Sequence, residues 1–225
     1  MYYEDTPVTW LENKHADSAA GRAAVDRLLP NGITHEARAF HAQLPRYEMT
    51  PLKRLGQLAS RLGVGSIWVK DESARFRLNA FKALGGSFAI YRLICEKVNR
   101  PNLSYADLMS EEIRAELGDI TFTSATDGNH GKGLAWATRK LGFPCVIYVH
   151  KLTSAARIAA IAEYGAEVRV VDGNYDDAVR QCERDARANG WQVVSDTSWP
   201  GYEEIPMAVM QGYTTLLSET QGQLA

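Results

Sequence analysis

A regular alternation of strand-like and helical patterns, beginning near residue 119, constrains the fold of this chain more than any other feature. Apolar runs predict strands at residues 120–123, 145–149, 167–171 and 192–195. Helical periodicity predicts helices between them at residues 131–141, 155–164 and 175–189. Glycines suited to helix C-termini follow these helices at Gly142, Gly165 and Gly190. A repeated β-α unit of this length predicts an α/β fold in which helices pack on a parallel sheet.

The segments before this alternation predict further elements. We expect a helix over residues 17–29 and another over residues 51–62, where leucines recur at helical spacing behind Pro51. A glycine turn then leads into a short strand at residues 66–70, which we expect to be buried. The next helix is expected to follow Asn79, a suitable N-cap, and to end near residue 99.

Lys82 lies in the first turn of that last helix, within an apolar stretch that contains no acid before Glu96. The helix dipole and burial against Phe81 and Leu84 both disfavour a charged ammonium group there. These effects predict a neutral, nucleophilic amine, the form that reacts with aldehyde cofactors. Taken alone, however, the stretch favours an ordinary lysine whose stem lies on the surface and whose ammonium group reaches water.

Composition excludes several function classes. The formal net charge is −2, which argues against a nucleic-acid or membrane-surface partner, and no run of 18 apolar residues predicts a transmembrane helix. The acidic N-terminus lacks the apolar core of a secretory signal. The three cysteines lie in apolar parts of expected elements, as buried thiols of a reducing compartment do: Cys95, Cys145 and Cys182. We therefore expect a cytoplasmic protein.

The loop at residues 123–131 lies between an expected strand and an expected helix N-terminus, where ligands bind in open α/β sheets. Its hydroxyls and glycine-flanked backbone N–H groups suit a carboxylate or another small anion. An Asx-type turn that caps the helix explains the same residues equally well. The order of the glycines differs from the dinucleotide-binding fingerprint. His130 has no second ligand at a metal-like spacing, so we expect no metal site.

Two segments together resemble the fold-type II enzymes that use pyridoxal 5′-phosphate. The first runs from Lys70 through Lys82 to Gly86, and the second is the loop at residues 125–131. Asp127, where that family generally has Ser or Gly, is similar to the diaminopropionate ammonia-lyases within it. The surroundings of Asp196 carry the same similarity: residues 194–199, Gly201, Tyr202, and Ile205 to Tyr213.

The resemblance implies a role for each matching residue. Lys82 would form the Schiff base with the cofactor, and Asn129 would hydrogen-bond the cofactor's ring oxygen. Asp127 and Asp196 would be the acid/base pair, one on each face of the planar adduct, so that both substrate enantiomers can react. Such work requires carboxyl groups with raised pKa values. The substrate would contact Ser124, Thr126, Asp127, Gly128 and His130.

Tyr175 is a further candidate for substrate contact, although the simpler interpretation is that Asn174 before it caps the next helix. The implied fold is like that of the tryptophan synthase β subunit, with parallel sheets and helices on both faces. Residues 1–88 and 201–225 would belong to the large cofactor-binding domain and residues 89–200 to a small α/β domain. The family also implies a homodimer.

The implied reaction is α,β-elimination of D- or L-2,3-diaminopropionate to pyruvate and ammonia. Two alternatives stay open: a threonine/serine ammonia-lyase, or an inactive α/β fragment that serves as a binding or interaction module. In this family a glycine-rich loop downstream of the second aspartate holds the cofactor phosphate. No such loop occurs before Ala225, so we expect the chain to be truncated to the N-terminal half of the family's length.

Overall fold

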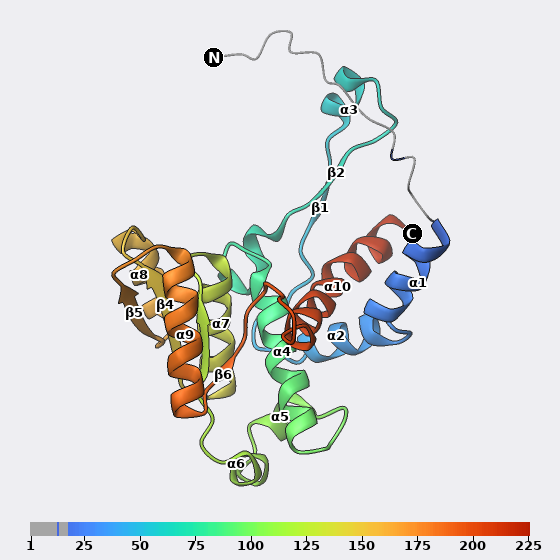
Figure 1. The fold of residues 1–225 in the computed structure, drawn as a ribbon. Coiled ribbons are helices and arrows are strands. Elements are labelled where there is room, and N and C mark those ends of the chain that lie inside the picture. Colours follow the sequence, from blue (N-terminus) through green and yellow to red (C-terminus); the bar gives the residue numbers. More distant parts are fainter. Residues whose placement is uncertain (1–12, 14–17) are drawn as a thin grey trace. The chain divides into compact units, whose positions relative to one another are not determined.

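The structure is a computed structural model that describes Asn13 and residues 18–225 (Figure 1). The described residues divide into two compact units, one that ends at Asn31 and one that comprises Gly32–Ala225. The first unit contains helix α1 (Ser18–Leu28), as expected, while Asp17 and the acidic N-terminal residues lie outside the described part. All other elements belong to the second unit. Among the described residues, no helix has the length and hydropathy needed to cross a membrane.

A four-stranded parallel sheet forms the predicted α/β part, with strand order β5-β4-β3-β6. Its strands are β3 (Phe122–Ala125), β4 (Cys145–His150), β5 (Glu167–Val171) and β6 (Gln192–Val193). The helices that connect them are α7 (Asn129–Leu141), α8 (Ala155–Ala162) and α9 (Tyr175–Asn189). The glycines predicted at the helix C-termini all have positive φ, at Gly142, Gly165 and Gly190. The predicted order of strands and helices is therefore confirmed.

Helices cover both faces of this sheet (Figure 1). Helix α9 packs on one face through Ala178 and Cys182, which join a buried cluster with Val146 and Tyr148. Helices α7 and α8 pack on the other face. Ile147, which lies between Val146 and Tyr148 in β4, points to that face because successive side chains of a strand alternate. Cys145 is buried as predicted, as is Cys182, whereas Cys95 is only partly buried.

Helix α4 (Lys82–Lys97) joins the sheet part to two further helices, α2 (Ile33–His41) and α10 (Glu204–Leu224). The backbones approach closely where glycines face α4. A Cβ atom at Gly133 of α7 would lie 2.8 Å from Ala83 N, and one at Gly212 of α10 would lie 2.6 Å from Leu84 O. These contacts hold the start of α4 between α7 and α10. The short helices α5 (Tyr105–Leu108) and α6 (Glu111–Leu117) follow.

A buried ionic network ties α10 to the segment before α4. Arg75, in the 3-10 segment η1 (Glu72–Arg77), donates to Glu219 Oε2 at 2.7 Å. Lys70 Nζ lies 2.8 Å from the same oxygen, and the Tyr47 hydroxyl donates to Glu219 Oε1 at 2.7 Å. Burial alone would raise the pKa of Glu219, but Arg75, Lys70 and Tyr47 outweigh burial and lower it to about 2.

The expected helix at residues 51–62 is wrong in its first half. Residues Leu52–Arg54 form strand β1, which pairs antiparallel with β2 (Trp68–Lys70), and helix α3 (Gly56–Leu62) begins only after them. The ladder continues to Leu55 N, which donates to Ile67 O. Strand pairing across the hairpin therefore determines the structure of these residues. The leucine spacing predicts only which side chains would share a helix face, and it carries no information about such a partner strand.

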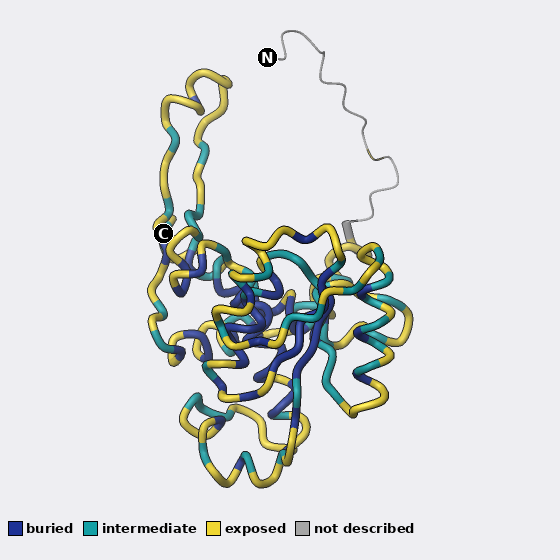
Figure 2. Tube along the Cα trace, turned by 90° about the vertical axis from the view of Figure 1, so that its left-hand side faces the viewer, coloured by how far each residue is buried: buried dark blue, intermediate teal, exposed yellow. Residues whose placement is uncertain are grey.

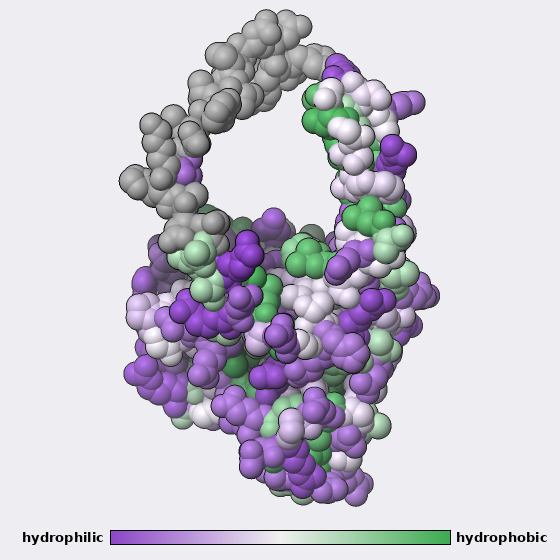
Figure 3. Space-filling view, turned by 90° about the vertical axis from the view of Figure 1, so that its right-hand side faces the viewer, coloured by the Kyte–Doolittle hydropathy of each residue, from purple (hydrophilic) through white to green (hydrophobic). Residues whose placement is uncertain are grey.

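Strand β2 is also more exposed than predicted, since Trp68 and Val69 retain 41% and 43% of their surface (Figure 2). Figure 3 shows further hydrophobic side chains on this hairpin, where Leu58, Leu62 and Val64 are exposed. The predicted N-cap of α4 is wrong as well. Asn79 has φ 56°, a left-handed conformation that asparagine tolerates, and α4 starts at Lys82 without a side-chain cap.

Candidate active site

The N-terminus of α4 and the segment after β6 meet in an ion pair. Lys82 Nζ lies 2.7 Å from Asp196 Oδ2, and both side chains keep part of their surface exposed. The rings of Phe81 and Tyr213 lie 5.7 Å and 5.4 Å from the same nitrogen, so aromatic faces border the ammonium group. A partly exposed amine between a carboxylate and aromatic rings is accessible to a small carbonyl compound.

The ion pair overturns the prediction of a neutral lysine. Burial lowers the pKa of Lys82, but Asp196 and Tyr213 outweigh burial, and the pKa is raised above its ordinary value. Burial likewise raises the pKa of Asp196, but the positive charges of His130, in the protonated form of its ring, and of Lys82 outweigh burial and hold that pKa below its ordinary value. The expectation of a raised Asp196 pKa is therefore also wrong for the protein with a free Lys82 amine. The sequence around Lys82 contains no acid, and the fold supplies one.

His130 is a buried neutral residue of the same site. Its Nε2 lies 2.9 Å from Val194 O, and since a carbonyl only accepts, Nε2–H is the donor. Burial lowers the pKa of His130, so the neutral ring carries a lone pair on Nδ1. That atom lies 3.8 Å from Asp196 Oδ2 and has no hydrogen-bond partner within the described chain.

The end of β3 and the loop that leads to α7 contain the polar groups expected to contact the substrate. Ser124 is fully buried, and its Oγ makes no hydrogen bond to any described residue. Thr126 Oγ1 accepts from Gly128 N at 3.4 Å, and Asn129 is exposed at the first position of α7. Gly128 occupies the N-cap position, and no side chain caps α7. The Asx-type cap is therefore wrong, and the first N–H groups of α7 remain available to an anion.

Asp127 pairs with side chains other than Lys82. Its Oδ2 lies 2.8 Å from Arg157 Nη1 and 3.4 Å from His150 Nε2, at the entrance to α8. It lines a cavity of about 240 Å³ together with Lys132 and Arg157. The structure thus brings Asp196 to Lys82 directly, whereas Asp127 pairs with Arg157 and His150, which no pattern in the sequence links to it.

Tyr175, the first residue of α9, lies near both aspartates. The pKa of its phenol is raised mainly by burial, and the negative charges of Asp196 and Asp127 raise it further. Its hydroxyl donates to Ala125 O at 3.4 Å. Asn174 also caps α9, since its side chain accepts from the Asp177 backbone N–H, so the two interpretations of this segment are compatible. The described residues contain no group of three His, Cys, Asp or Glu side chains placed to hold a metal ion.

Comparison with known proteins identifies the family. The profile of the family described as "Pyridoxal-phosphate dependent enzyme" matches residues 44–225. The chain belongs to this family. The diaminopropionate ammonia-lyase of Salmonella typhimurium is 49% identical over 207 residues, which are 91% of this chain and 51% of that relative. The diaminopropionate ammonia-lyase of Escherichia coli K12 is 48% identical over 189 residues, 84% of this chain and 47% of the relative.

Solved structures show the same relationship. The apo form of Escherichia coli diaminopropionate ammonia-lyase superposes with a TM-score of 0.81 at 46% identity, over 88% of this chain and 53% of that one. The same enzyme in complex with an aminoacrylate-PLP azomethine reaction intermediate gives a TM-score of 0.78. These matches confirm the predicted fold-type II architecture. The chain spans about half the length of the curated relatives it matches.

Pyridoxal 5′-phosphate is the cofactor of this family, and the residues around Lys82 fit part of it. An accessible lysine amine, the uncapped N-terminus of α7, and the unpartnered Ser124 Oγ and His130 Nδ1 together offer a covalent anchor and several polar contacts. Lys82 would hold the cofactor covalently, and Asn129 is exposed at the start of α7, where its amide can reach a ligand.

Proposed function

We propose that this chain is the part of a diaminopropionate ammonia-lyase that contains the cofactor-binding lysine, Lys82. Such an enzyme eliminates ammonia from D- or L-2,3-diaminopropionate to give pyruvate. The observation that carries the proposal is the Lys82–Asp196 pair, 2.7 Å apart, in a chain 48–49% identical to two such enzymes. The cofactor, when bound, supplies an electron sink for the carbanion that forms as the α-proton leaves.

The roles of the chain's own groups follow from their chemistry. The loop at residues 124–130 binds the substrate carboxylate through the N–H groups at the start of α7 and the Ser124 hydroxyl. Asp196 and Asp127 transfer protons, and a carboxylate also attracts the substrate's distal ammonium group. Once Lys82 is covalently engaged, Asp196 loses its ammonium partner while its burial persists. Its pKa then rises toward the range that proton transfer requires.

Several wider properties belong to the same proposal. The family supports a homodimer. The three free thiols support a cytoplasmic location, because disulfides are rare in that compartment. Residues 1–88 and 201–225 are assigned to the large domain and residues 89–200 to the small one. A threonine/serine ammonia-lyase is the second candidate, which relatives of 29–30% identity support more weakly than the diaminopropionate enzymes.

Covalent trapping tests the proposal. The purified protein is mixed with pyridoxal 5′-phosphate and reduced with borohydride, and modified lysines are located by mass spectrometry. We expect modification at Lys82, and none there in Lys82→Ala. Lys53, which is paired with Asp71 on the exposed hairpin, serves as the comparison lysine. Equal modification of Lys53 and Lys82 would show that Lys82 is not a specific anchor. Pyruvate release from diaminopropionate, compared with 2-oxobutyrate release from threonine, distinguishes the two candidate reactions.

A further inference from the structure

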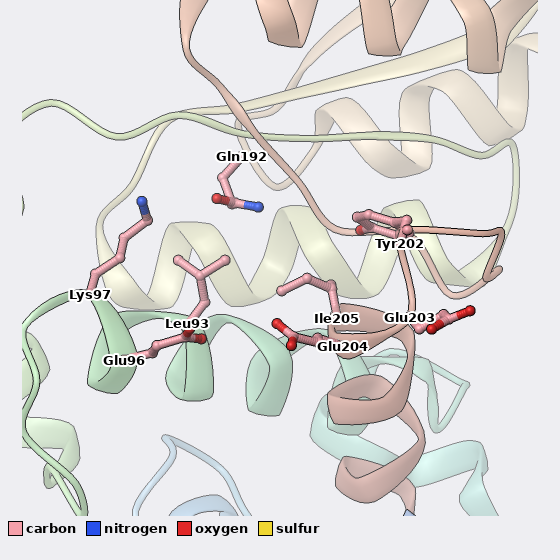
Figure 4. Close-up of a pocket in the computed structure, with 9 residues that line it drawn as sticks. Leu93, Glu96, Lys97, Gln192, Tyr202, Glu203, Glu204 and Ile205 are labelled. Carbon is pink, nitrogen blue, oxygen red and sulfur yellow. The ribbon is translucent and has the colours of Figure 1, made fainter.

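Tyr202 links a cavity on one side to the backbone before Asp196 on the other. Its ring stacks on Trp199 with centroids 4.1 Å apart, and it lines a cavity of about 600 Å³ (Figure 4). Glu96, Gln192 and Glu204 point toward the same space from α4, β6 and α10 (Figure 4). The sequence singles out Tyr202 as part of the Asp196 surroundings without giving it a role.

The Tyr202 hydroxyl bridges two backbone groups on the outer edge of β6. It donates to Val193 O at 3.0 Å and accepts from Ser195 N at 2.9 Å. The inner edge of the strand pairs with β3, since Val194 N donates to Thr123 O. Burial raises the pKa of the Tyr202 phenol, so the hydroxyl stays protonated and can donate throughout the neutral range. One side chain thus takes the place of a neighbouring strand.

This bridge ends one residue before Asp196. His130 Nε2–H donates to Val194 O, so the hydroxyl and the imidazole fix the chain at three successive residues, 193–195. Beyond them, Asp196 pairs with no strand in the described part of the chain, so the position of its backbone depends on residues 193–195. The titratable groups around its carboxylate are Lys82 on α4, His130 on α7, Tyr213 on α10, Tyr175 on α9 and Tyr202 itself.

We propose that Tyr202 is a positioning residue, whose hydroxyl fixes residues 193–195 so that the Asp196 carboxylate stays against Lys82. This inference rests on the proposed function for its catalytic meaning, but the positioning itself can be measured without cofactor or substrate. A purely structural tyrosine would stabilise β6 and leave the Lys82 amine unchanged. A positioning tyrosine also controls how strongly that amine is protonated.

The test is the acylation rate of Lys82 at pH 8, measured residue by residue with mass spectrometry in the whole protein. Only the neutral amine reacts, so loss of the Asp196 partner accelerates acylation. We expect Tyr202→Phe to acylate about tenfold faster at Lys82, the change that a pKa fall of about one unit gives. Tyr105→Phe is the matched control, because the Tyr105 hydroxyl also donates to a backbone carbonyl, Lys140 O at 3.0 Å, on a different segment.

A double variant separates positioning from general loosening. In an Asp196→Asn background, Tyr202→Phe should produce no further acceleration, because no carboxylate is left to position. An unchanged rate in Tyr202→Phe, or equal acceleration with and without Asp196, would overturn the inference. If Tyr202→Phe does not fold, Trp199→Leu removes the ring against which Tyr202 stacks, so that the Tyr202 hydroxyl is no longer held at residues 193–195. Faster acylation of Lys82 that disappears in the Asp196→Asn background then supports the inference, and an unchanged rate, or acceleration that persists without Asp196, overturns it. A wild-type protein that fails to trap pyridoxal 5′-phosphate would refute the proposed function while leaving these rates interpretable.

Discussion

Lys82 Nζ and Asp196 Oδ2 lie 2.7 Å apart although the two residues are 114 positions apart in the chain. The pair joins the first turn of α4 to the residues that follow the edge strand β6. Because Asp196 offsets the effects of burial, the amine is held as an ammonium group until its partner is removed or the amine itself reacts. The state of this pair therefore governs when Lys82 can act as a nucleophile.

The first prediction distinguishes the two aspartates. Asp196→Asn should raise the acylation rate of Lys82 at pH 8 by about tenfold or more, since removing a neighbouring carboxylate lowers a lysine pKa by about one unit or more. Asp127→Asn should leave that rate unchanged, because Asp127 pairs with Arg157 and His150. Mass spectrometry of both variants checks this, and acceleration in Asp127→Asn would contradict the geometry described here.

Local patterns and distant contacts account for what the sequence could and could not predict. The sheet and its helices were predicted because each strand and helix carries its own periodicity and glycine stop, as α9 and Gly190 show. The ion pair of Lys82 could not be predicted, since its acid lies on another element. The leucine spacing of residues 51–62 wrongly predicted a helix along the whole segment, because the first residues pair with β2, which lies outside that segment.

The second prediction concerns the buried carboxylate of Glu219. Glu219→Gln leaves Arg75 and Lys70 without their anionic partner, and breaking a buried pair in this way costs about 3–5 kcal/mol of unfolding free energy. Urea unfolding at pH 7 measures that loss. Arg157→Ala is the control, because its pair with Asp127 is exposed and should contribute less than about 1 kcal/mol.

The third prediction is the pH dependence that the same carboxylate produces. The folded-state pKa of Glu219 is lowered to about 2 from its ordinary value of 4.5, so the folded state binds a proton at this carboxylate less readily than the unfolded state does. Its contribution to stability is therefore complete above pH 4.5 and is lost as the pH falls toward 2. Unfolding free energies at several pH values should decline less steeply over that window in Glu219→Gln. Parallel curves for the two proteins would contradict this assignment.

The fourth prediction concerns the close approach of α7 to the start of α4. Gly133→Ala places a Cβ atom 2.8 Å from Ala83 N, and a backbone atom cannot move aside without shifting Lys82 next to it. Overpacking of this kind lowers the unfolding free energy by about 1–3 kcal/mol. Replacing glycine by alanine inside a helix raises it by about 1 kcal/mol, so the net effect is a loss of stability over most of that range. Gly86→Ala is the matched control, since its nearest contact would be an ordinary 3.7 Å. Urea unfolding should therefore show a loss of stability in Gly133→Ala and none in Gly86→Ala.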